Sequence, residues 1–170
     1  MLTAEQQLIR QAQAGDQTAF TQLAAQYRER LHRFLWLKSG DRGDAEDATQ
    51  EALLNAWRYL QSYNEKWQFS TWLYRIGLRQ LSRPRAVTGI ELEPVVSDNI
   101  DAELDSDNVW RTARRCLSAD ACRAMWLKYA EDASVKEIAE VLDRSQVWVK
   151  VNLMRSRQRL ARELNERSDQ

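Results

Sequence analysis

The segment DAEDATQEALLNAWR, from Asp44 to Arg58, carries the hydrophobic pattern of an amphipathic helix. At helical spacing, one apolar stripe is formed by Ala48, Ala52, Leu53, Ala56, Trp57 and Leu60. The rest of the surface carries the polar residues Asp47, Gln50, Glu51, Asn55 and Arg58. The stripe suits a protein core. The polar face is either solvated surface or a partner's contact site, and composition alone does not separate the two readings.

Helical periodicity recurs along most of the chain, and strand-like alternation never lasts beyond a few residues. Thr3 with Gln6 predicts a capping box that opens the first helix, and Asp16 predicts the cap of the second. Ser39 to Gly43 is expected to be a turn. A fourth helix is expected over about 70–82. The predicted fold is all-α, with two small helical domains at 1–85 and 109–170, the second built of four helices, and an acidic linker at 86–108.

The charges are balanced overall but not locally, with 25 basic and 25 acidic residues. Residues 1–85 hold 12 basic and 9 acidic residues, residues 86–120 hold 3 and 8, and residues 121–170 hold 10 and 8. The local balances are therefore +3, −5 and +2. An acidic middle is either a solvated tether or a mimic of a nucleic-acid backbone, and the two readings are close to even.

The C-terminal domain has the proportions of a helix-turn-helix. Ser134 with Glu137 predicts a capping box, and the three residues from Asp143 to Ser145 separate that short helix from a long basic one. A plain helical hairpin explains this geometry about equally well. The residues left off the inner stripe of the long helix favour major-groove binding, and they are Gln146, Trp148, Lys150, Asn152 and Arg155.

A second candidate nucleic-acid site lies in the first domain. Its basic residues are Arg75, Arg79, Arg83 and Arg85, and no acidic residue occurs between Lys66 and Ile90. Aromatic side chains beside such a basic track could stack on unpaired bases. Aromatics at helical spacing more often form a core, which we favour for Trp72 and leave open for Trp67 and Tyr74.

The sequence offers little for catalysis or metal binding. His32 is the only histidine and there is no CxxC pair, so we expect no metal site and no cofactor. Cys116 and Cys122 are expected to be reduced thiols. We find no nucleophile–base pair or glycine-rich phosphate loop, and we expect no enzymatic activity. No membrane span or signal peptide is apparent, which predicts a cytoplasmic protein.

Taken in order, three blocks of this chain resemble the extracytoplasmic-function (ECF) sigma factors of the sigma-70 family of bacterial RNA polymerase. These blocks are DAEDATQEALLNAWR, then FSTWLYRIG from Phe69 to Gly77, and SVKEIAEVLDRSQVWVKVNLMRSRQRL from Ser134 to Leu160. The resemblance covers nearly the whole chain.

This resemblance implies a promoter-recognition subunit of RNA polymerase. Asp47, Gln50, Glu51 and Asn55 would dock on the clamp helices of the largest core subunit. The stretch from Trp67 to Arg85 would recognise and melt the minus-10 element, and the last helix would read the minus-35 element of promoter DNA. The linker would thread through the polymerase toward the RNA path, and a separate anti-sigma factor is a family expectation.

Two stretches depart from the family pattern. The fourth helix continues as RIGLRQLSRPR where relatives often have RIARN, and Trp148 stands where relatives often carry threonine. We expect altered DNA contacts at both places. The main rival hypothesis is a free-standing, dimeric helix-turn-helix regulator with a separate helical effector domain, which would bind promoter DNA tightly without polymerase.

Overall fold

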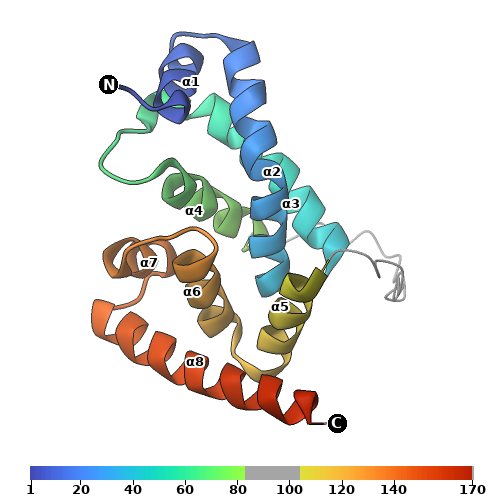
Figure 1. The fold of residues 1–170 in the computed structure, drawn as a ribbon. Helices are drawn as coiled ribbons and strands as arrows, with labels where there is room; N and C mark the ends of the chain where they lie inside the picture. Colours follow the sequence, from blue (N-terminus) through green and yellow to red (C-terminus); the bar gives the residue numbers. More distant parts are fainter. Residues whose placement is uncertain (83–103, 170) are drawn as a thin grey trace.

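A computed structural model describes residues 1–82 and 104–169, and within these ranges the chain is helical with short connections (Figure 1). The helices are α1 (Ala4–Gln13), α2 (Gln17–Ser39), α3 (Arg42–Arg58), α4 (Phe69–Leu81), α5 (Leu104–Cys116), α6 (Ala119–Tyr129), α7 (Val135–Leu142) and α8 (Gln146–Ser168), with a 3₁₀ turn, η1, at Leu60–Ser62. The predicted all-α fold is confirmed.

Local capping signals place most of the helix ends. The capping box of Thr3 and Gln6 forms at the start of α1, and Asp16 accepts hydrogen bonds from two backbone amides of α2. The turn expected at Ser39 to Gly43 is shorter than predicted, because Asp41 caps α3 by accepting a bond from the amide of Asp44 at 2.7 Å. Helix α3 therefore begins at Arg42, two residues before the expected Asp44.

Helices α2, α3 and α4 form the core of the N-terminal domain. From α2, Leu31, Phe34 and Leu35 are fully buried. Small side chains line the inner face of α3, which permits close packing against α2. Gly77 lets α4 pack equally close to α2, since a Cβ there would lie 3.0 Å from a methyl carbon of Leu31.

The C-terminal domain is a four-helix unit, α5 to α8, as predicted. Helix α7 lies against α8, and Ile138 of α7 and Val149, Leu153 and Leu160 of α8 are all buried. Asp143 adopts a left-handed conformation with φ of 53°, which ends α7 and turns the chain into α8. Helix α5 begins at Leu104, inside the range 86–108 expected for the linker. Residues 83–103 lie outside the described residues, so the linker and its bounds stay predictions.

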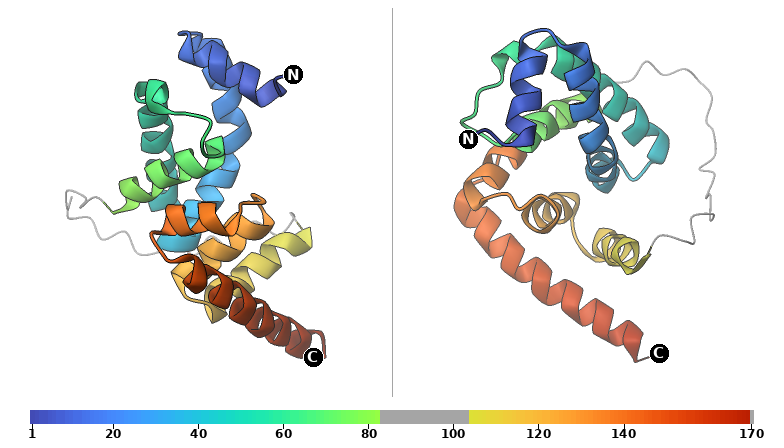
Figure 2. Two further views of the ribbon diagram at one scale, coloured as in Figure 1. Left: turned by 90° about the vertical axis from the view of Figure 1, so that its left-hand side faces the viewer. Right: turned by 45° about the horizontal axis from the view of Figure 1, so that its top comes forward.

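The two domains pack against one another. Helix α4 lies against α7, and the C-terminal half of α2 reaches α6, as the two views in Figure 2 also show. At the far end of α2, the guanidinium of Arg114 from α5 lies 5.2 Å from the ring centre of Trp36. It also occupies the space beside Gly40, where a Cβ would lie 1.7 Å from Arg114 Nη2. Gly40 has a φ of 73° and ends α2. In the free chain, the C-terminal domain thus covers one side of α2 and α4.

Candidate nucleic-acid interface

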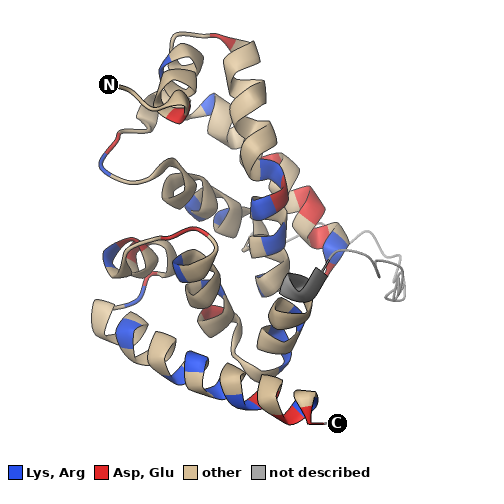
Figure 3. Cartoon of the chain, viewed as in Figure 1, with Lys and Arg blue, Asp and Glu red and all other residues tan. Residues whose placement is uncertain are grey.

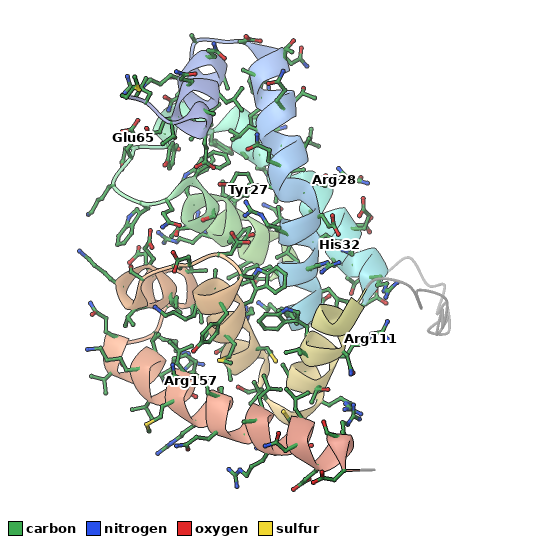
Figure 4. The ribbon with its side chains drawn as sticks, viewed as in Figure 1. Tyr27, Arg28, His32, Glu65, Arg111 and Arg157 are labelled. Atoms are coloured by element: carbon green, nitrogen blue, oxygen red, sulfur yellow. The ribbon has the colours of Figure 1, made fainter. Side chains whose placement is uncertain are left out.

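The outer face of α3 presents three of the four residues predicted for polymerase docking. Asp47, Gln50 and Glu51 are exposed, and Leu54, 58% exposed, lies beside them. Gln50 donates a hydrogen bond to Glu46, which also pairs with Arg28 of α2. Figure 4 shows Arg28 and His32 on the side of α2 that faces α3.

Asn55 does not share that exposed face. It is 7% exposed and accepts a hydrogen bond from Arg58 at 3.3 Å. Asn55 follows Ala48 by seven residues, two helical turns, so it lies on the buried side of α3. Trp57, expected in the apolar stripe, is instead 36% exposed and packs against Phe20 with tilted rings, whose centres are 5.1 Å apart.

Tyr74 of α4, for which the sequence left both a core position and base stacking open, is a core residue in the free chain. Its side chain is fully buried and stacks on Phe34 of α2, with ring centres 4.7 Å apart. Its hydroxyl donates a hydrogen bond to Glu131, which follows α6 in the other domain. Burial raises the pKa of Tyr74 well above its ordinary value, so the hydroxyl stays protonated and donates. No base could reach this ring in the closed chain.

The other predicted minus-10 residues differ in their surroundings. Trp67 is half-buried, and Lys66 and Lys136 each place an ammonium nitrogen 5.6 Å from its ring centre. Arg75 is half-buried and its Nη1 lies 2.8 Å from a carboxylate oxygen of Glu140 on α7. Arg79 is exposed. Arg83 and Arg85 lie outside the described residues.

Three glutamates of the C-terminal domain therefore hold polar groups of the N-terminal domain. Besides Glu140, the carboxylate of Glu137 accepts a bond from the backbone amide of Gln68 at 3.2 Å while its other oxygen completes the α7 capping box. Glu131 accepts from Tyr74 and lies 3.4 Å from Arg30 of α2.

The side chain of Glu131 is enclosed by the surrounding helices and only 3% exposed. Burial raises the pKa of its carboxyl above the ordinary value, although Tyr74 and Arg30 oppose that shift. The domain interface thus contains a carboxylate that water hardly reaches.

The predicted reading helix, α8, is open by comparison. Gln146, Lys150 and Arg155 are exposed. Trp148 is half-buried beneath Arg144, whose guanidinium lies 5.0 Å from its ring centre. Asn152 is half-buried and donates to the carbonyl of Trp148 at 2.9 Å. Three of the five predicted residues therefore face solvent, and two rest on α8 and its turn.

Most of α8 carries only positive charge. Its first seventeen residues, 146–162, contain five basic side chains and no acidic one, and Glu163 and Glu166 follow (Figure 3). Arg157, labelled in Figure 4, donates to the hydroxyl of Tyr129 on α6 at 2.8 Å. The residues predicted to contact DNA on this helix carry donor or large planar groups. Val147 and Met154, which are not among them, are 70% and 47% exposed, and their helical spacing places them opposite the inner stripe.

Metal and thiol chemistry have little support among the described residues. Within residues 1–82 and 104–169, no cluster of three histidine, cysteine or acidic side chains is placed to hold a metal ion. Cys116 and Cys122 are free thiols, and burial raises the pKa of Cys122 to about 12. Across the same ranges, no helix is both long and apolar enough to cross a membrane.

Comparison with known proteins matches these surfaces to two family models. Residues 23–83, which include α3 and α4, match Sigma-70 region 2, and residues 111–160, which include α7 and most of α8, match Sigma-70 region 4. Helix α3 and helix α8 thus fall in two separate regions of one family.

Proteins of similar sequence are named as ECF RNA polymerase sigma factors. The ECF RNA polymerase sigma factor SigM of Mycobacterium tuberculosis is 33% identical over 88% of this chain and 79% of its own length. SigW of Bacillus subtilis is 28% identical over 93% of this chain and 95% of its own. The ECF RNA polymerase sigma-E factor of Escherichia coli is 29% identical over 91% of each chain.

Solved structures agree with the fold. CnrH, solved in complex with the cytosolic domain of CnrY, superposes with a TM-score of 0.69 at 26% identity, over 96% of this chain and 99% of that one. The sigma factor RpoE of Bartonella quintana, solved with the anti-sigma factor NepR, gives a TM-score of 0.65 at 21% identity, over 86% of this chain and 96% of that one, and shows the same fold. With both regions in order and a relative of this similarity, the chain belongs to the ECF sigma factors of the sigma-70 family, the subunits that direct RNA polymerase to promoters.

Proposed function

We propose that the exposed face of α3 docks this sigma factor on core RNA polymerase, at the clamp helices of the largest subunit. Asp47, Gln50 and Glu51 supply polar contacts, and Leu54 beside them supplies apolar area. Asn55 is assigned to the core of the domain, because it is buried in the free chain. Docking then uses a surface that the fold leaves open.

For the minus-10 element, we propose that Arg75 and Arg79 of α4 contact the DNA backbone and that Trp67 stacks on an unpaired base. Arg83 and Arg85 stay predictions of the same kind. Contact by Arg75 requires its ion pair with Glu140 to break, so this proposal includes the separation of α4 from α7.

For the minus-35 element, α8 enters the major groove. Gln146, Lys150 and Arg155 are placed to contact base edges and phosphates, since they are exposed near the beginning of the second helix of a helix-turn-helix. Trp148 and Asn152 contribute by shaping the helix surface, because their polar or planar groups are already in contact with α8 and its turn. This exposed basic helix is the observation that carries the proposal.

The remaining family expectations are proposals as well. We infer a cytoplasmic protein without catalytic activity, whose partners are core RNA polymerase and promoter DNA. A separate anti-sigma factor is the further partner that the family resemblance implies.

Run-off transcription with purified core polymerase and genomic DNA tests the function. Transcripts that depend on this chain, and that disappear when Lys150 and Arg155 are changed to alanine, are expected. Tight promoter binding by the chain alone, with no polymerase-dependent transcript, would instead establish a free-standing regulator.

The docking surface has its own test. Gln50→Ala combined with Glu51→Ala should weaken co-purification with core polymerase while the circular-dichroism spectrum stays unchanged, because both side chains are exposed. Gln26→Ala combined with Glu29→Ala removes the same two residue types from an exposed part of α2 and serves as the matched control. Equal recovery of core by all three proteins contradicts the docking assignment.

A further inference from the structure

Helix α8 carries a second apolar stripe, on the face that points away from the core. Val147, Val151 and Met154 are spaced by four and three residues, so they share one side of the helix. That side is opposite the buried pair Val149 and Leu153. Val147 is 70% exposed, Met154 is 47% exposed and Val151 is half-buried. Single apolar side chains are ordinary on a surface, but these three are in register.

Basic side chains border this stripe on both sides. Lys150 lies around the helix from Val147 and Met154 in one direction, and Arg155 lies next to Val151 in the other. Both are exposed, and no acidic residue occurs on α8 before Glu163. The blue positions along this helix in Figure 3 mark the same charge.

The DNA major groove has the complementary pattern. Its rims are two phosphate backbones, and its floor presents the C5 methyl group wherever thymine occurs. Side chains without hydrogen-bonding groups distinguish bases there by contact with that methyl. Val147 is the second residue of α8, and the first residues of such a helix are the ones that reach base edges.

We propose that Val147, Val151 and Met154 contact thymine methyl groups in the minus-35 element, with Lys150 and Arg155 on the flanking strands. This inference rests on the proposed role of α8. It adds that promoter choice depends on apolar contact as well as on the hydrogen-bonding residues of the helix. The occupant of the stripe is duplex DNA with thymine under the N-terminal half of α8.

The test removes single methyl groups from the DNA. Promoter templates from the run-off experiment are made with one thymine of the upstream element replaced by deoxyuridine, and the affinity of the complete holoenzyme is measured for each. The contacted thymines should show a loss of about fourfold, the effect of returning one buried methyl group to water. Thymines elsewhere in the element serve as internal controls.

The protein side of the test uses Val147→Ala and Met154→Ala, which change exposed side chains and leave the core intact. Each variant should bind the all-thymine template several-fold more weakly and lose the response to deoxyuridine at its own position. Leu2→Ala, which shortens an exposed leucine in front of α1, should keep the full response.

Each other outcome is decisive. Unchanged affinity for every deoxyuridine template, or an equal response in the wild type and both variants, overturns the methyl-contact proposal while the sigma-factor function stands. Loss of core-polymerase binding by Val147→Ala and Met154→Ala would show that the stripe docks on protein, which also overturns it. Absence of any wild-type transcript overturns the proposed function and this inference together.

Discussion

Helices α4 and α8 carry similar sequence signals for DNA binding but differ in what covers them. On α4, Tyr74 is buried and Arg75 pairs with Glu140 of the other domain. On α8, Lys150 and Arg155 face solvent. A basic or aromatic residue on a helix therefore indicates DNA binding only when no other part of the chain already contacts that side chain.

The difference lies in the three glutamates that face α2 and α4. Glu131, Glu137 and Glu140 supply acceptors to Tyr74, Arg30, Arg75 and the amide of Gln68. Helix α8 itself carries no acidic side chain over residues 146–162. Helix α8, the proposed reading helix, thus leaves Lys150 and Arg155 exposed in the free chain, whereas Tyr74 and Arg75 of α4 contact the other domain.

Replacing Tyr74 by alanine should have the largest effect on this comparison. The change removes the ring stacked on Phe34 and leaves Glu131 without its hydroxyl donor. We expect the free energy of unfolding to fall by about 3–5 kcal/mol, measured by urea denaturation. Tyr74→Phe keeps the ring and should cost about 1–2 kcal/mol. An exposed role for Tyr74 would instead leave stability unchanged in both variants.

Changing Lys150 or Arg155 to alanine should act on DNA binding and not on folding. Each side chain is exposed, so the urea midpoint should stay the same. The holoenzyme should lose about 1–3 kcal/mol of promoter binding for a base contact. For a phosphate contact, the slope of the logarithm of the binding constant against the logarithm of the salt concentration should instead decrease in magnitude by about one. Normal transcription by both variants would contradict the proposal that α8 recognises the minus-35 element.

The sequence predicted the helices well because their signals are local. The caps at Thr3, Asp16 and Ser134 depend on residues within three positions, and each forms as expected. The inner stripe of α8 follows from its own periodicity and is buried as predicted.

Site residues were harder to predict, because their surroundings come from distant parts of the chain. Tyr74 meets an acceptor 57 residues away, which no local pattern reveals. Asn55 was misplaced because the stripe of α3 is rotated toward Ala45 and Thr49, leaving Trp57 at its edge. Val147 and Met154 were not predicted as DNA contacts because they carry neither a hydrogen-bonding nor a large planar group.

The enclosure of Glu131 predicts a pH dependence with a definite sign. Burial raises the pKa of its carboxyl in the folded chain. Its contribution to stability is therefore fully present below the ordinary glutamate pKa of about 4.3 and is lost as the pH rises through the raised value. The loss amounts to about 1.4 kcal/mol for each unit of the shift. Urea denaturation of wild type and Glu131→Gln across this range should show the decline only in the wild type; parallel curves would contradict it.

The ion pair between Arg75 and Glu140 should contribute least. Both side chains are more than a third exposed, so water and salt screen their attraction. Arg75→Ala should lower the free energy of unfolding by at most about 1 kcal/mol, and Glu140→Ala by a similar amount. In the double variant the second change should cost less than it does alone, which a double-mutant cycle by urea denaturation measures.

Because so weak a contact breaks easily, Glu140→Ala should leave α4 more accessible to solvent. That is measured as faster amide hydrogen exchange in α4 than in the wild type, with α8 unchanged as the internal reference.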